Sequence, residues 1–284
     1  EDRELLLEIA GHAITRTYPA RRVFALVGPG RNGKTVWMDV LRSLLGDENV
    51  GDVSLSSVAG DDSKGGKGVI GNHLAVDDDA TGTKIKDVSV LKKLSGGAQA
   101  TLDIKYLQCE GYNNYATVCF AANNPPSIED KSDAAKERLT PIRLPHRFTN
   151  KSDGHKDAVN RSKLVKSLTR RGELKRLLAV AVERAQQQYD TGEITSGRGE
   201  DERWEIYNKY SDTTYRFWSE CMESDTGSKI SKKAVYETYV QRCESEGIDP
   251  QPQRGPTSFW SISRQSAGIS FDDDARLGDK TAVK

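Results

Sequence analysis

The sequence predicts an α/β fold in which a sheet strand leads into a phosphate-binding loop. Residues 21–150 alternate apolar runs with helical or turn-like segments, which is the pattern of an α/β sheet protein. Three of these runs are typical of strands: RVFALVG at 22–28, HLAVDDD at 73–79 and ATVCFAAN at 116–123. The first run leads directly into a glycine-rich loop, and apolar residues at helical spacing follow that loop.

A helix is expected ahead of the first strand, over residues 1–20, with Pro19 ending it. Its apolar side consists of Leu5, Leu6, Ile9 and Ile14. The chain begins without Met and within this helical pattern, so we expect it to be a fragment of a longer protein.

The loop from Gly28 to Thr35 has the spacing G-x-x-x-x-G-K-T. Its glycines allow successive backbone N–H groups to surround a polyphosphate at the start of a helix. Lys34 would then contact the β- and γ-phosphates of ATP, and the Thr35 hydroxyl would bind Mg²⁺. The alternative is a glycine-rich turn that binds nothing. The residues expected to contact ATP from this loop are Gly28, Pro29, Gly30, Arg31, Asn32, Gly33, Lys34, Thr35 and Val36.

Three acids, Asp77, Asp78 and Asp79, follow the second predicted strand. Beside a phosphate loop, one carboxylate can hold Mg²⁺ through water and its neighbour can activate the attacking water. We assign Asp78 to the metal and Asp79 to the water, and Asp77 takes the first role if the strand ends one residue earlier. An acidic surface turn is the alternative.

The third predicted strand ends in Asn123 and Asn124, followed by two prolines. We expect this strand to lie between the other two, where an asparagine amide can hydrogen-bond the γ-phosphate or the attacking water. Asn-Asn-Pro-Pro is also an ordinary turn sequence, which leaves a plain turn as the alternative.

Composition narrows the class of protein without identifying it. The chain has 42 basic and 42 acidic residues, so any nucleic-acid binding must come from a local patch. The four cysteines have no C-x-x-C spacing, which disfavours a zinc site or a disulfide framework. No apolar run is long enough to span a membrane and no signal peptide is recognisable, so we expect an intracellular protein.

The order of these motifs resembles the superfamily 3 helicases, an AAA+ group that drives replication of small viruses, phages and plasmids. The likeness is to the helicase half of poxvirus-, phage- and plasmid-type primase-helicases. It is carried by LVGPGRNGKT, GNHLAVDDDATG, LKKLSGGAQATLDIKYLQCE and CFAANNPPSIEDKSDAAKERLTPIRLP. The resemblance implies an AAA+ P-loop three-layer sheet domain flanked by helices.

Several site residues follow from this resemblance alone. Asn123 matches the family's sensor asparagine, and Arg138 occupies the place of its arginine finger, which acts on ATP bound by the neighbouring subunit. Lys92 would contact ATP from an adjacent subunit as well. Lys105 and Tyr106 match a hairpin that holds single-stranded DNA in the channel of a hexamer. An ordinary surface arginine and an exposed strand face are the respective alternatives for Arg138 and the hairpin.

One departure from the family concerns Asp79, because many relatives carry a glutamate there. Aspartate is shorter by one methylene, so the water would be held differently while the chemistry stays the same.

The C-terminal part resembles the winged-helix module that follows the helicase domain in these proteins. Its expected DNA-contacting face is Arg254, Ser258, Ser261, Arg264 and Gln265, with Phe259, Trp260 and Ile262 partly in the core. Asp272, Asp273 and Asp274 in the expected wing would repel phosphate, so packing or partner docking is the alternative. The predicted parts are therefore an N-terminal helical segment (1–20), the ATPase domain (21–150), a helical extension and linker (151–201) and the winged-helix-like domain (202–284).

The resemblance implies a replicative DNA helicase, the motor part of a primase-helicase from a virus, phage or plasmid. A hexameric ring would hydrolyse ATP with Mg²⁺ between subunits, move 3′ to 5′ on single-stranded DNA and unwind forked DNA. A primase domain would lie upstream of Glu1. Two alternatives stay open: a P-loop ATPase that remodels or packages DNA, and an initiator or loader that binds ATP without turnover.

Overall fold

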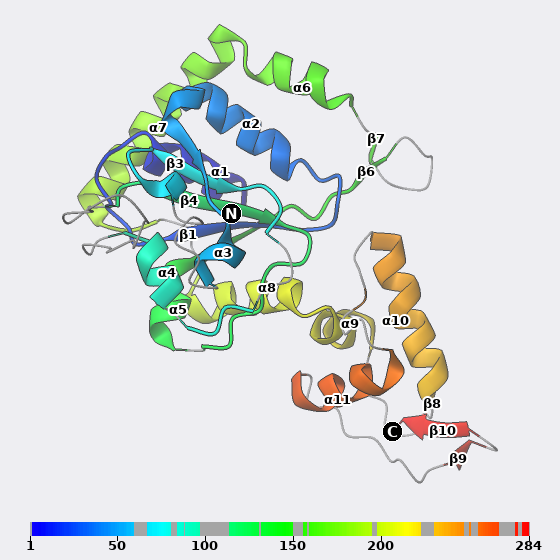
Figure 1. Ribbon diagram of the computed structural model, residues 1–284. Coiled ribbons are helices and arrows are strands. Elements are labelled where there is room, and N and C mark those ends of the chain that lie inside the picture. Colours follow the sequence, from blue (N-terminus) through cyan, green and yellow to red (C-terminus); the bar gives the residue numbers. More distant parts are fainter. Residues whose placement is uncertain are drawn as a thin grey trace. The chain divides into compact units, whose positions relative to one another are not determined.

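The computed structural model describes residues 2–59, 67–80, 84–87, 89–96, 114–130, 132–149, 156–157, 159–194, 198–222, 230–246, 250, 255–266, 276–277 and 280–283 (Figure 1). The chain forms two compact units, residues 1–207 and 208–284. The division falls within helix α8 (Glu200–Ser211), whereas the sequence places the start of the C-terminal part at residue 202. The predicted four-part organisation stays a prediction.

The first unit is built on a five-stranded sheet in the order β2-β3-β4-β1-β5, and every neighbouring pair is parallel. The α/β prediction is confirmed, and the third predicted strand (β4) does lie between the other two (β1 and β3). Because parallel strands end at the same edge of a sheet, the segments that follow β1, β3 and β4 meet there. The strands are β1 (Val23–Val27), β2 (Val50–Asp52), β3 (Leu74–Asp77), β4 (Thr117–Ala122) and β5 (Leu139–Arg143).

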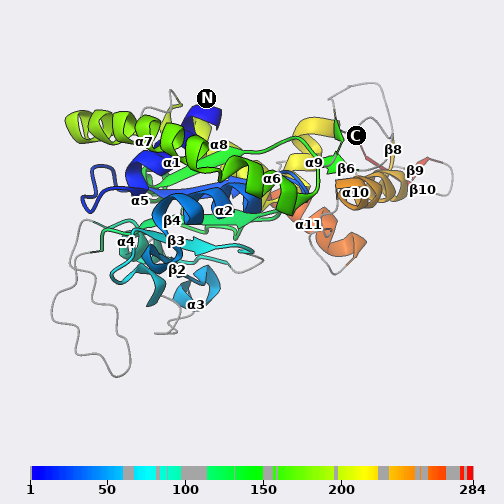
Figure 2. The same cartoon turned by 90° about the horizontal axis from the view of Figure 1, so that it is seen from above.

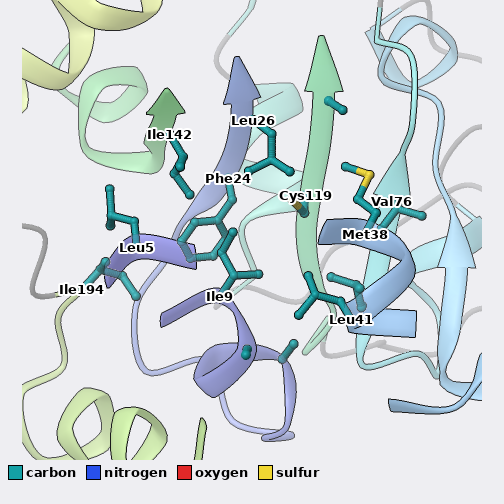
Figure 3. Close-up of a cluster of buried hydrophobic side chains, with 14 of the residues drawn as sticks. Leu5, Ile9, Phe24, Leu26, Met38, Leu41, Val76, Cys119, Ile142 and Ile194 are labelled. Carbon is teal, nitrogen blue, oxygen red and sulfur yellow. The ribbon is translucent and has the colours of Figure 1, made fainter. Parts of the chain in front are cut away.

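Helices cover both faces of this sheet (Figures 1 and 2). Successive side chains of a strand point to opposite faces. On one face, Phe24 and Leu26 of β1 pack in a core with apolar side chains of three helices (Figure 3). On the other face, Phe120 of β4 meets Tyr207 of α8 edge to face, with ring centroids 6.5 Å apart. The three helices of the first core are α1 (Asp2–Ala13), α2 (Lys34–Leu45) and α7 (Arg171–Thr191).

Short elements connect the strands of the sheet. They are the helices α3 (Leu55–Ala59), α4 (Ser89–Leu94) and α5 (Asp133–Arg138) and the 3₁₀ turns η1 (Asp47–Asn49) and η2 (Lys67–Val69). A two-stranded parallel pair, β6 (Phe148–Thr149) with β7 (Lys156–Asp157), precedes α6 (Arg161–Leu168). In the part of the chain that the structure describes, no helix has the length and hydropathy that a membrane span requires.

The N-terminal helix is shorter than the sequence predicts, because α1 ends at Ala13 and not at Pro19. The buried ring of His12 explains the early end. Its Nε2 lies 2.9 Å from the carbonyl oxygen of Ala20, which returns the chain to the helix ahead of β1. Its Nδ1 lies 2.6 Å from Oγ1 of Thr117, the first residue of β4. A continued helix would carry residue 20 away from this ring.

The predicted helical extension forms two helices, α6 and α7. Thr169 caps α6 through its hydroxyl, which donates to the carbonyl oxygen of Val165 at 2.9 Å. Arg170 is extended, with φ −61° and ψ 144°, so the helix cannot continue through it. Gly192 ends α7 in the left-handed conformation at φ 72°, inside the segment that the sequence predicts as a linker.

After the end of α8, the described residues of the second unit form three helices and a small antiparallel sheet in the order β8-β10-β9. The pairing of β9 with β10 agrees with the hairpin that the sequence predicts at the C-terminal end. These elements are α9 (Thr213–Cys221), α10 (Lys232–Glu246), α11 (Pro256–Ser266), β8 (Ile230–Ser231), β9 (Arg276–Leu277) and β10 (Lys280–Val283).

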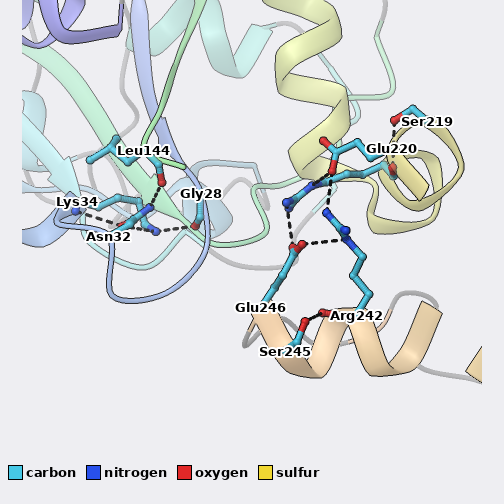
Figure 4. Close-up of polar contacts among 10 residues, drawn as sticks. Gly28, Asn32, Lys34, Leu144, Ser219, Glu220, Arg242, Ser245 and Glu246 are labelled. Carbon is cyan, nitrogen blue, oxygen red and sulfur yellow. Dashed lines mark hydrogen bonds and ion pairs between the residues drawn. The ribbon is translucent and has the colours of Figure 1, made fainter. Parts of the chain in front are cut away.

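An aromatic core and an ion-pair network hold the helices of the second unit together. Phe217, Trp218, Tyr239 and Phe259 are buried in one cluster. On the surface, two arginines and two glutamates of α9 and α10 form four ion pairs that alternate in charge (Figure 4). The four residues are Arg216, Glu220, Arg242 and Glu246. Phe259 and its cluster confirm the expected inward face of α11.

Candidate functional site

The phosphate loop leaves the carboxyl end of β1 and enters α2. Gly28 and Gly33 have φ values of 147° and 95°, which side-chain-bearing residues rarely adopt. A Cβ atom on Gly28 would overlap the carbonyl oxygen of Leu144, so this turn packs directly on the chain that follows β5. Gly33 is the N-cap of α2. The amides of the first turn of α2 have no helical acceptors and are available to an anion.

Lys34 is buried in this loop, with only 7% of its surface exposed. Its ammonium group donates to the carbonyl oxygens of Gly28 (2.7 Å) and Pro29 (3.1 Å) and to Oδ1 of Asn32 (3.0 Å) (Figure 4). A fourth contact joins it to Oδ1 of Asn123, at 2.8 Å. Burial lowers the pKa of Lys34 to about 8. The phosphate loop and the strand β4 are thus connected through one lysine.

Asn32 positions the loop from inside. Its amide nitrogen donates to the carbonyl oxygen of Leu144 at 2.7 Å, and its amide oxygen accepts from the side chain of Lys34. The side chain is buried. Asn32 therefore fixes the lysine relative to the end of β5.

The three acids after β3 lie in different surroundings. Asp77 accepts from the backbone N–H of Leu55 at 2.8 Å and of Asp79 at 3.4 Å, and partial burial raises its pKa. Its carboxylate supports the local turn, whereas Asp78 and Asp79 line the cleft described below. Desolvation raises the pKa of Asp78, and the nearby charges of Arg42 and Arg161 oppose that shift.

A cleft of about 860 Å³ gathers most of the predicted residues at this edge of the sheet. It is lined by the loop from Gly30 to Val36, by Asp78 and Asp79 after β3, and by Asn123 after β4. Asn124 does not line it, and its buried Oδ1 has no partner among the described residues. The structure thus brings together residues of three strands that lie far apart in the sequence.

Besides Ala121 and Ala122 at the end of β4, the same cleft is lined by four residues that the sequence analysis did not identify: Phe148, Val159, Arg161 and Leu164. They come from β6 and from α6 with the residues just before it. Val159 is 62% exposed. No motif marks these positions. The sequence signal that could have located α6 is its N-cap, Asn160, whose side chain accepts from the N–H of Lys163.

Arg138 does not line the cleft of its own chain. It is the last residue of α5 and precedes β5, whose first residue pairs with Val23 at the start of β1. The phosphate loop follows the other end of β1, roughly 13 Å along the strand. The Arg138 guanidinium donates to the carbonyl oxygen of Ala134 at 2.8 Å, and its buried Nε has no partner in the described part of the chain.

The remaining predicted residues lie apart from the cleft or outside the described residues. Lys92 is exposed on α4. Arg264 is exposed on α11 in the second unit, as are Ser261 and part of Ser258. Lys105, Tyr106, Arg254, the side chain of Gln265 and the acidic segment of the expected wing, Asp272–Asp274, all lie outside the described residues.

The donor set of the cleft fits Mg²⁺. Thr35 offers a hydroxyl and Asp78 a carboxylate. Desolvation is the largest cause of the raised pKa of Asp78, and the charges of Asp52 and Asp39 add to it. A bound cation would stabilise the charged form of this carboxylate. The described residues hold no group of three or more His, Cys, Asp or Glu side chains arranged for a metal. Mg²⁺ does not need one, since it keeps several waters and uses one or two carboxylates with substrate phosphates.

One family model and several solved structures are similar to this chain. A family model described as "Family of unknown function (DUF5906)" matches residues 26–138, from β1 to the end of α5. No curated protein matches the chain. A structure of the NrS-1 C-terminal region is 12% identical with a TM-score of 0.45, over 100% of this chain and 72% of that one. A structure of JCV helicase with a bound small molecule is 15% identical with a TM-score of 0.36, over 66% of this chain and 60% of that one.

Proposed function

We propose that the cleft hydrolyses ATP with Mg²⁺ and that the protein is an ATP-driven DNA helicase of the superfamily 3 type. The observation that carries the first part is the meeting of Lys34, Asp78, Asp79 and Asn123 in one cleft. A phosphate loop, a metal-binding acid, an acid for the attacking water and a polar sensor are the parts that phosphoryl transfer to water needs. The helicase assignment is supported by the order of the sequence motifs.

Each residue has a role that its position supports. Lys34 would exchange its loop and Asn123 acceptors for the β- and γ-phosphates, which leaves Asn123 free to bond the γ-phosphate or the water. Asp79 would accept the proton of the attacking water. Thr35 and Asp78 would hold Mg²⁺, which neutralises charge on the phosphates when bound.

Arg138 would act on the ATP of a neighbouring subunit. Its place at the amino end of β5 keeps it one strand length from its own phosphate loop, which supports action in trans. A guanidinium there would stabilise charge on the transferred phosphoryl group. Catalysis would then require an oligomer, for which the sequence resemblance implies a hexameric ring. Lys92 would add a second contact from the adjacent subunit.

DNA would be held by Lys105 and Tyr106 in the ring channel, with translocation 3′ to 5′ on one strand of a fork. A winged-helix role for the second unit, with Arg264 toward DNA, belongs to the same proposal. The three helices and the β9–β10 hairpin support it. An intracellular location and a primase domain upstream complete the proposal.

The test is a mixing experiment with ATPase activity as the readout. Lys34→Met and Arg138→Ala should each lose turnover, the latter about 1,000-fold. Mixing the two variants should restore part of the activity, because an intact cleft then meets an intact Arg138 across a subunit boundary. Arg176→Ala, an exposed arginine on α7, is the matched control and should behave as wild type. No recovery on mixing would contradict action in trans.

Single-stranded DNA separates the helicase proposal from its two alternatives. Wild-type turnover should rise with protein concentration and with DNA, and Lys105→Ala should remove the DNA stimulation. ATPase activity that does not change when DNA is added would favour a remodelling or packaging ATPase. DNA binding without turnover would favour an initiator or loader.

A further inference from the structure

The cleft has an apolar wall that phosphate chemistry does not use. This wall is formed by Phe148, Val159 and Leu164, which line the same cleft as Lys34. A triphosphate and Mg²⁺ need N–H groups, cations and oxygen ligands, and gain nothing from such side chains. Val159 is 62% exposed although it belongs to a defined cleft. Exposed apolar side chains gathered in a pocket mark a ligand site.

Two contacts hold this wall to the phosphate-binding elements. The backbone N–H of Phe148 donates to the carbonyl oxygen of Arg31 in the phosphate loop, at 2.9 Å. The guanidinium of Arg161 donates twice to Oδ2 of Asp39 on α2, at 2.7 and 3.0 Å. Helix α6 also lies next to α2, which follows the phosphate loop (Figure 1). A ligand bound by the loop therefore has the wall at a fixed place beside it.

We infer that the wall of Phe148, Val159 and Leu164 binds the base of a nucleoside triphosphate by apolar contact, with little discrimination between adenine and guanine. This inference rests on the proposed function, since it assumes that the loop holds the phosphates. Among the described cleft residues of β6 and α6 and the residue just before α6, the polar side chain is that of Arg161. Its guanidinium already donates to the carboxylate of Asp39. Base selection requires directional hydrogen bonds, whereas apolar contact accepts any flat ring of similar size.

The test compares the binding of ATP, GTP and inorganic tripolyphosphate to the intact chain by calorimetry with Mg²⁺. Leu164→Ala should weaken the binding of ATP and GTP by about five- to tenfold, because methylene contacts with the base are lost. Tripolyphosphate has no base, so its binding should weaken by less than about twofold. Leu168→Ala is the matched control, since Leu168 lies on the same helix and outside the cleft lining, and it should change nothing. Val159→Ser repeats the test at an exposed position that the fold does not need.

Each outcome has one meaning. Selective weakening of the nucleotides by Leu164→Ala and Val159→Ser, with ATP and GTP within about threefold of each other, supports the inference. Equal weakening of all three ligands, or none, overturns it and leaves the phosphate site in place. A preference for ATP over GTP above about tenfold also overturns it. If wild type binds none of the three, the proposed function itself fails, and the inference with it.

Discussion

The histidine at the end of α1 allows a stability prediction with a defined size. The ring of His12 is buried between Ala20 and Thr117. Because a carbonyl oxygen only accepts, Nε2 carries the proton that bonds Ala20, and in the neutral ring Nδ1 accepts from the Thr117 hydroxyl. Burial favours this neutral ring in the folded protein. Protonation of Nδ1 would reverse the direction of the Thr117 bond and place a charge in the core beneath β4.

Burial lowers the pKa of His12 from 6.5 to about 4. The unfolded chain binds a proton below pH 6.5 that the native protein does not bind, so stability falls as the pH falls from 6.5 toward 4. A difference of about 2.5 in pKa corresponds to a loss of about 3 kcal/mol in all. Between pH 7 and pH 5 the linked loss is about 2 kcal/mol.

The assay is urea unfolding of wild type and His12→Gln at pH 7 and pH 5. The Gln amide can donate to Ala20 and accept from Thr117 but does not titrate. Wild type should lose about 2 kcal/mol more than His12→Gln on this change of pH. His146→Gln replaces an exposed histidine and should retain the wild-type dependence. Equal losses in wild type and His12→Gln would refute the reasoning.

Three further predictions concern the cleft and its support. Asn123→Ala should lower the ATPase rate at least about 30-fold with less than a threefold change in ATP affinity, and an unchanged rate would exclude a role in hydrolysis. Gly11→Ala places a Cβ 2.7 Å from Cβ of Arg184 on α7. It should cost about 1–3 kcal/mol in urea unfolding, and a wild-type midpoint would show that the two helices can separate. Chelation of Mg²⁺ should abolish hydrolysis and leave the melting temperature of the nucleotide-free protein unchanged, whereas a lower melting temperature would indicate a structural metal.

The sequence predicted the elements whose signals are local. The phosphate loop is one contiguous motif, and the strands that end at Val27, Asp77 and Ala122 are short apolar runs followed by the glycine-rich loop, by acids and by asparagines, respectively. Once strands are parallel, their ends share one edge of the sheet, so the meeting of Asp79 and Asn123 with the loop follows from the fold class.

What the sequence could not predict depends on contacts between distant residues. The end of α1 is set by His12 and Thr117, which are 105 residues apart. The apolar wall of the cleft comes from the packing of α6 beside α2, and Leu164 has no local pattern that separates it from Leu168. The environment of Asp77 likewise depends on the N–H of Leu55, which engages its carboxylate.

The most direct measurement for the central claim is phosphate release from ATP by wild type and Asp79→Asn, at saturating ATP and Mg²⁺, beside ATP binding by the same two proteins. An asparagine keeps the size of the side chain and cannot accept the proton of water. We expect both proteins to bind ATP within a few-fold of each other and the variant to lose at least about 100-fold in turnover. Wild type that binds no ATP, or a variant that hydrolyses it at the wild-type rate, would contradict the assignment of this cleft.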